Sequence, residues 1–190
     1  MNTPSHHHQR AFTLIEVIVV ISTLAFTLPI VTIILFMIIR QQIAVTRMAE
    51  SKRQGDQATA LIQNVLTSEV VSMYDGGGAV CASDIGAIKN ISYFLDNNGD
   101  EIRFGVSSGV LNITRVTSGG EITKPITSSQ KIIVENSLTY PFTVQCIRNK
   151  TYTEPIVGIS FSIVPFGNFR TEELVNLRLH YSTKVIIRNK

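Results

Sequence analysis

The sequence is poor in charged residues and in cysteine. Charged side chains make up 16% of the 190 residues and hydrophobic ones 44%, which is apolar for a soluble protein of this size. The formal net charge of +3 is too small to argue by itself for nucleic acid as a partner. The two cysteines, Cys81 and Cys146, cannot form a structural zinc site alone, because such sites use four ligands.

Groupings of catalytic residues are also scarce. The run Gly-Val-Ser-Ser-Gly at 105–109 matches a nucleophile elbow by letter, but it lies between two expected strands instead of between a strand and a helix. His180 is the one histidine downstream of this run. We therefore expect neither enzyme activity nor a cofactor.

An uncharged apolar segment lies near the N-terminus. No charged residue occurs between Val17 and Ile39, a stretch of about 35 Å as a helix, which is enough to cross the roughly 30 Å core of a bilayer. The segment is longer than the apolar region of a secretory signal peptide. It predicts an N-terminal membrane anchor.

Glu16 stands just before this uncharged stretch, within the apolar segment. A carboxylate at such a position costs a few kcal/mol even on lenient insertion scales, so an ionisable group there is a functional candidate by default. The alternative is that Glu16 extends to the headgroups at the end of the helix.

The residues around Glu16 form a recognisable motif. The run Ala11-Phe12-Thr13-Leu14-Ile15-Glu16-Val17, joined to the long apolar segment, resembles the cleavage and methylation motif of the type IV pilin family. The resemblance covers residues 9–40. It implies that a prepilin peptidase cuts between Ala11 and Phe12 and then methylates the new amine of Phe12. Glu16 becomes the fifth mature residue, with Thr13 in the linking run. The family usually has Gly at the position of Ala11, but a small side chain still fits a narrow protease pocket.

The resemblance implies a structural role. We expect a minor pilin or pseudopilin, a subunit of a type IV pilus or a type II secretion-like filament. The Glu16 carboxylate would pair with the Phe12 amine of a neighbouring subunit, which relieves two desolvation costs. Pro29 is expected to kink the helix. The implied partners are other pilins or pseudopilins, the prepilin peptidase and an inner-membrane assembly platform.

The expected location is the bacterial cytoplasmic membrane, crossed once, with the C-terminal domain outside the cytoplasm, and then a cell-surface or periplasmic filament. A Cys81–Cys146 disulfide is the expectation there, with two buried thiols as the alternative. The positive-inside rule disagrees, because the leader side offers Arg10 while four basic residues follow the apolar segment: Arg40, Arg47, Lys52 and Arg53. We give priority to the peptidase motif and the cysteines.

The sequence predicts four segments: a leader at 1–11 that is removed, a transmembrane or filament-core helix at 12–39, an amphipathic helix at 40–74, and a β-rich extracytoplasmic domain at 75–190. Apolar residues spaced by three and four support the second helix, although Gly55 weakens its middle. Asn98-Gly99 and Gly119-Gly120 predict hairpin tips. The expected strands are 91–95, 102–106, 110–116, 131–135, 142–147, 157–164, 174–181 and 183–187. This is an α+β fold, a long helix packed on a C-terminal antiparallel sheet, which matches the ladle shape of pilins.

Two further readings concern ligands. Asp96, Asn98 and Asp100 stand at alternate positions, as in the first part of a calcium loop, but Glu101 occupies the position where that loop needs Gly; a hairpin turn is the preferred interpretation. The alternative function is a membrane-anchored tip adhesin or a DNA-binding module of an uptake filament. The basic residues at 47–53 have no interleaved aromatics, which favours a solvated face over a DNA-binding one.

Overall fold

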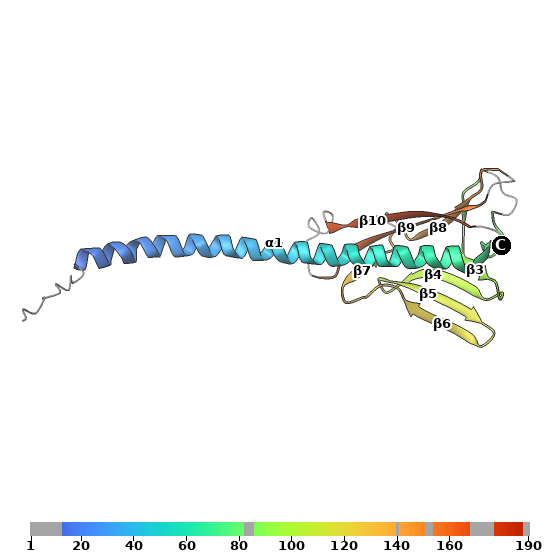
Figure 1. The fold of residues 1–190 in the computed structure, drawn as a ribbon, viewed down its shortest axis with the longest axis horizontal. Coiled ribbons are helices and arrows are strands. Elements are labelled where there is room, and N and C mark those ends of the chain that lie inside the picture. The colour runs from blue at the N-terminus through green and yellow to red at the C-terminus, as the bar shows by residue number, and fades with distance from the viewer. Residues whose placement is uncertain (1–12, 82–85, 140, 151–153, 168–176, 188–190) are drawn as a thin grey trace, which may run out of the picture. The chain divides into compact units, whose positions relative to one another are not determined.

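The computed structural model describes residues 13–81, 86–139, 141–150, 154–167 and 177–187. The predicted leader and the predicted cleavage and methylation positions, Ala11 and Phe12, lie outside these residues. The chain divides into two units, Met1–Val45 and Thr46–Lys190. Helix α1 (Leu14–Ser68) contributes to both (Figure 1).

The first unit consists, in its described part, of the beginning of α1. Every side chain from residue 13 to residue 43 is exposed. Among the described residues, α1 is the one helix long and apolar enough to cross a membrane, and an apolar surface on all sides of a helix is typical of a segment that faces lipid. The helix continues through Pro29 without interruption, and a bend at that residue stays a prediction.

Five strands form the first sheet of the second unit. Its order is β1 (Val70–Tyr74), β3 (Tyr93–Asp96), β4 (Glu101–Ser107), β5 (Val110–Thr117) and β6 (Gly120–Pro125), and each neighbouring pair is antiparallel. The β3–β4 turn contains Gly99 at φ +84°, a left-handed conformation that glycine adopts without strain. The hairpin tip predicted at 98–99 is confirmed. The tip predicted at 119–120 lies one residue earlier, at 118–119, because Gly120 already pairs with Thr117 as the first residue of β6.

The second sheet has the order β10 (Leu179–Ile186), β9 (Ile156–Pro165), β8 (Thr143–Ile147) and β2 (Lys89–Asn90). A further strand, β7 (Ile132–Glu135), pairs with the last part of β9, beyond the stretch that β8 occupies. All these pairings are antiparallel. The prediction of one sheet is therefore wrong in number, although the strand direction is right.

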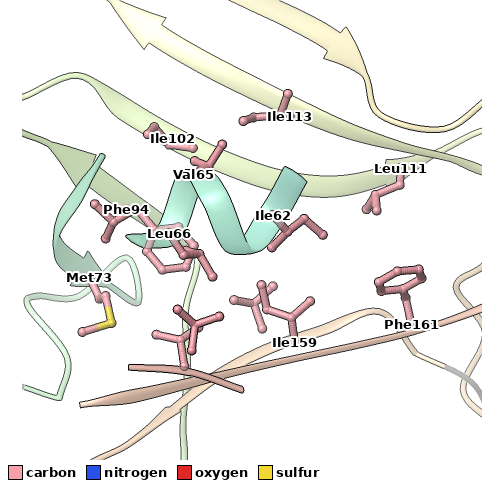
Figure 2. Packing of buried hydrophobic residues seen from close by; sticks show 14 of the residues in the cluster. Ile62, Val65, Leu66, Met73, Phe94, Ile102, Leu111, Ile113, Ile159 and Phe161 are labelled. Carbon is pink, nitrogen blue, oxygen red and sulfur yellow. The ribbon is translucent and has the colours of Figure 1, made fainter. Parts of the chain in front are cut away.

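The core of the second unit forms where α1 passes between the two sheets (Figure 1). Ile62, Val65 and Leu66 of α1 are buried. Figure 2 shows them between Phe94 and Ile102 of the first sheet and Ile159 of the second sheet. A helix covered on two sides must bury small or apolar side chains at positions three or four residues apart. The buried positions of α1 follow this spacing: Ser51, Gly55, Ala58, Ile62, Val65 and Leu66. The predicted α+β class, a long helix packed on antiparallel β-structure, is confirmed.

The predicted helix at 40–74 is wrong at its end. α1 stops at Ser68, and residues 70–74 form β1, which pairs with β3 from Val70↔Asp96 to Tyr74↔Tyr93. The valines at 70 and 71 are β-branched and favour a strand, and the pairing with β3 overrides the helical spacing of the apolar residues. The β-rich part of the chain therefore begins before residue 75.

Candidate functional site

The start of α1 is capped by Thr13. The Glu16 amide donates to the Thr13 carbonyl at 3.1 Å and the Val17 amide to the same carbonyl at 3.3 Å. The Thr13 hydroxyl accepts a longer bond of 3.4 Å from the Glu16 amide. Thr13 is thus the N-cap residue and Glu16 the third residue of the helix, the spacing of a capping box.

This cap was not found by sequence reasoning, which treated Thr13 only as part of the cleavage motif. The available signal was the Thr-x-x-Glu spacing before an apolar run. The cap fixes the position of Glu16 at the first turn of α1. A negative charge there is favoured by the partial positive charge of the helix N-terminus.

Glu16 is the acidic residue in the first turn of α1 and lies on its exposed surface. None of the ion pairs formed among the described residues includes Glu16. The carboxylate is therefore presented at the margin of an apolar surface, without a salt bridge inside the part of the chain that the structure describes.

Four hydroxyl side chains lie within the apolar half of α1, and each donates to a carbonyl of the preceding turn. Ser22 donates to Ile18 at 2.8 Å, Thr23 to Val20 at 2.9 Å, Thr27 to Thr23 at 3.0 Å and Thr32 to Leu28 at 2.8 Å. These bonds satisfy the hydroxyls in an apolar surrounding. By helical spacing, Thr23 and Thr27 share the face of Glu16, whereas Ser22 and Thr32 lie on other sides. One side of the apolar segment therefore carries Glu16 and two of the four hydroxyls in a line.

The disulfide predicted between Cys81 and Cys146 is confirmed. The two Cα atoms are 6.3 Å apart and the bond joins residues 65 positions apart in the chain, within the ordinary range for such bridges. Both cysteines are 1% exposed. The bridge connects the segment that follows β1, an edge strand of the first sheet, with β8 of the second sheet.

Asp96, Asn98 and Asp100 form a turn. One Asp96 carboxylate oxygen accepts the Asn98 amide at 2.7 Å and the Asp100 amide at 3.0 Å, which is the local bonding of an Asx turn. In the described ranges, no three His, Cys, Asp or Glu side chains gather where they could hold a metal ion. The arrangement at these three residues is explained by the β3–β4 hairpin.

The Gly-Val-Ser-Ser-Gly run at 105–109 also forms part of a hairpin. Gly105 lies within β4, and Ser108 and Gly109 form the tip between β4 and β5 with φ values of +52° and +73°. Positive φ at both tip residues is typical of a two-residue type I′ turn. No strand-to-helix elbow is present at these residues.

Comparison of the chain with protein-family models, with curated proteins and with solved structures finds no match in any of the three. The chemistry of the site itself carries the functional argument. That chemistry is a capped helix start with a carboxylate in the first turn, followed by an exposed, uncharged apolar helix.

Proposed function

We propose that this chain is a structural subunit, a minor pilin or pseudopilin, of a type IV pilus or type II secretion-like filament. One observation carries the proposal: Glu16 is held by the Thr13 cap at the first turn of a helix whose next 23 or so residues, about 35 Å, are uncharged, mostly apolar and exposed. A surface of this kind is stable in a bilayer or in a bundle of similar helices.

The first step would be removal of the leader by a prepilin peptidase between Ala11 and Phe12. The cut creates a positively charged amine at Phe12, two residues before the helix begins at Leu14. N-methylation leaves this amine charged. When the helix moves from the membrane into a bundle, both the amine and the Glu16 carboxylate lose water. Pairing the amine of one subunit with the carboxylate of the next offsets both penalties and fixes the axial register between subunits.

The polar line on α1 supports the same role. Thr23 and Thr27 lie on the face of Glu16, and threonine side chains allow helices to approach and to exchange hydrogen bonds in an apolar surrounding. This face is the one that we expect to meet neighbouring subunits. Phe12 and Glu16 would set the register, and Thr23 and Thr27 would pack within the same contact.

The second unit would lie outside the cytoplasm. The Cys81–Cys146 disulfide supports this placement, because such bonds persist in oxidising compartments. The basic residues after the apolar segment favour the opposite orientation, so the leader would have to be kept in the cytoplasm by the peptidase and the assembly platform. Those two proteins and other pilins or pseudopilins are the proposed partners.

The experiment that tests this proposal removes the negative charge of Glu16 and keeps a side chain of the same size and shape. Glu16→Gln retains a side chain that fits a capping box but cannot pair with an ammonium as an anion. We expect Glu16→Gln to insert into the membrane as the parent protein does and to be lost from sheared filaments. Glu50→Gln, on the same helix in the second unit, is the matched control and should be incorporated normally.

Two results would contradict the proposal. One is recovery of Glu16→Gln in filaments at the parental level. The other is a mass for the parent protein, isolated from cells, that retains Met1 to Ala11 in place of an N-methylated Phe12. Immunogold labelling of filaments and intact-mass measurement supply these readouts.

A further inference from the structure

A row of isoleucines crosses the outer face of the second sheet. Ile156 of β9 is the direct partner of Ile147 on β8 and of Ile186 on β10. Ile88 directly precedes β2, which pairs with β8. Ile88 and Ile147 line the same hollow. Ile88 is 65% exposed and Ile186 55% exposed. The row lies opposite the core, because the adjacent positions Val157, Cys146 and Val185 are the buried ones.

The neighbouring row of the same face contains a gap. Gln145, Gly158 and Lys184 are directly paired across β8, β9 and β10. Because Gly158 has no side chain, a hollow of about 320 Å³ opens there, bordered by Ile88, Ile147 and Ile156 on one side and by Gln145 and Lys184 on the other. We call this hollow with its isoleucine row the isoleucine groove.

Beyond Gly158, the next two outer positions of β9, Ser160 and Ser162, are polar, so they separate this apolar surface from Val164 and Ile133 at the far end of the sheet. The Thr143 and Ser160 hydroxyls are 2.6 Å apart on paired strands, and Ser162 is 2.9 Å from Nδ1 of His180. An alternation of polar outer and apolar inner residues is what a solvent-facing sheet requires. A contiguous apolar patch on such a face marks an interaction surface.

We propose that the isoleucine groove docks a segment of another protein chain that presents aliphatic side chains beside a carboxylate. Lys184 is the charged residue among the described side chains that border the groove, and it calls for an anionic group on the partner. The same face of a second copy is disfavoured, because the described residues that border the groove include no carboxylate to pair with Lys184.

The shape of the groove favours a protein segment. The row crosses four adjacent strands, about 14 Å at 4.8 Å per strand, which matches roughly four residues of extended chain at 3.3 Å each. The exposure of Ile88 and Ile186 leaves both ends open, whereas small-molecule sites enclose most of their ligand. This inference uses only the second unit and does not depend on the role proposed for Glu16.

Gly158 allows the groove to be filled without disturbing the fold. A Cβ built on Gly158 would have its nearest neighbour, the Gln145 carbonyl oxygen, at 4.0 Å, an ordinary contact. Gly158→Val should therefore fold and occupy the hollow, since valine favours strands. Gly105→Val is the matched control: Gly105 lies in β4 of the first sheet, and a Cβ built there meets no atom within 4 Å.

The test uses the full-length protein in its host cell with a benzophenone amino acid in place of Ile88. We expect a specific cross-linked adduct whose partner peptide, sequenced by mass spectrometry, contains aliphatic and acidic residues. Adding Gly158→Val or Lys184→Glu should reduce the adduct at least about tenfold, equivalent to about 1.4 kcal/mol of binding. Adding Gly105→Val or Lys184→Arg should leave it within about twofold.

Several outcomes would overturn the inference. One is an adduct level no higher than that obtained with benzophenone at Ile122, an exposed residue of β6. The others are an adduct to lipid, a symmetric adduct between two copies at Ile88, and an adduct whose yield Gly158→Val leaves unchanged. Filament incorporation is scored separately in the same cells, so failure here is distinguishable from failure of the proposed function.

Discussion

At the residue scale, the presence of Gly55 within the last third of α1 is explained by Tyr181. A Cβ on Gly55 would lie 2.2 Å from Cζ of the Tyr181 ring. That ring stacks on Phe161 with centroids 5.3 Å apart, and its hydroxyl donates to the Lys52 carbonyl at 3.1 Å. Burial, with a smaller contribution from Asp56, raises the pKa of the Tyr181 phenol. The glycine weakens the helix by itself, but it lets β10 approach α1.

Gly55→Ala is expected to destabilise the second unit. The gain in helix propensity is about 1 kcal/mol, and overpacking typically costs about 1–3 kcal/mol. Because a Cβ at 2.2 Å from the Tyr181 ring is a severe overlap, we expect the upper part of that range and a net loss of up to about 2 kcal/mol. Chemical denaturation of the full-length protein in detergent, followed by tyrosine near-UV circular dichroism, measures it.

The control for this prediction is a double-mutant cycle. In a Tyr181→Ala background the clash is absent, and Gly55→Ala should become stabilising through helix propensity alone. If Gly55→Ala destabilises both backgrounds equally, the contact with Tyr181 is not the reason for the glycine.

Glu50 provides a prediction on pH. Its carboxylate bonds Arg53 through two contacts of 2.8 and 3.0 Å and Lys131 at 2.9 Å. The bond from Arg53, then that from Lys131, lowers the pKa of Glu50 from 4.5 to about 2. Because the folded-state pKa is the lower one, the stabilising contribution is complete above pH 4.5 and is lost as the pH falls toward 2.

The comparison of Glu50→Gln with the parent protein tests this. The parent should be the more stable of the two at pH 6, and the difference should shrink between pH 4.5 and 2. The groups are partly exposed, so added salt should also reduce the difference at pH 6. A difference that stays constant across this pH range would show that the Glu50 charge does not contribute. Denaturant midpoints at each pH supply the measurement.

At the scale of elements, the sequence predicts a strand well where alternation and a turn signal coincide. β4 and β5 were expected at nearly their observed bounds, because alternating apolar residues meet a Ser-Gly tip. β6 was missed because all six of its residues are exposed, so it has no apolar face to detect. The apolar residues of β1 continue the spacing of α1 and so predict a helix, and only the distant pairing with β3 makes this segment a strand.

The candidate functional residues likewise include some that the local sequence predicts and some that depend on the folded sheet. Glu16 and the cysteine pair could be found from local pattern and from cysteine count. The isoleucine groove could not, because Ile147, Ile156 and Ile186 come from three strands whose register is set by the whole sheet. Gly158 reads in the sequence as a weak point of a strand, and only its neighbours show that it leaves a hollow.

The capped start of α1 gives a prediction for that element. Thr13→Val keeps the branched shape and removes the hydroxyl that accepts from the Glu16 amide at 3.4 Å. Loss of a cap costs about 1 kcal/mol, so the Glu16 amide of the full-length protein in micelles should exchange with solvent about fivefold faster. Thr13→Ser retains the hydroxyl and should exchange at the parental rate. Equal protection in all three proteins would show that the Thr13 carbonyl alone holds the turn.

At the scale of the whole second unit, two sheets that share no strand pairing are held together by what lies between and across them. α1 contributes the shared apolar core through Ile62, Val65 and Leu66. The Arg115–Glu69 ion pair joins β5 to the residue after α1. The Cys81–Cys146 bridge is a covalent cross-link between the segment that follows β1 and β8 of the second sheet. Removing the bridge therefore raises the conformational entropy of the unfolded chain and so lowers the free energy of unfolding.

The double variant Cys81→Ala/Cys146→Ala is expected to lose about 4 kcal/mol of unfolding free energy, the chain-entropy value for a loop of some 65 residues. Truncating two buried side chains also removes packing contacts. The control is therefore the parent protein with its disulfide reduced, which keeps both side chains. It is prepared by unfolding the parent with a thiol reductant, and its unfolding is measured under reducing conditions. The two should show similar losses, with the variant slightly less stable. Because both cysteines are 1% exposed, the native oxidised protein should resist reduction until it unfolds. A reduced parent as stable as the oxidised one would show that α1 and the core alone hold the sheets together.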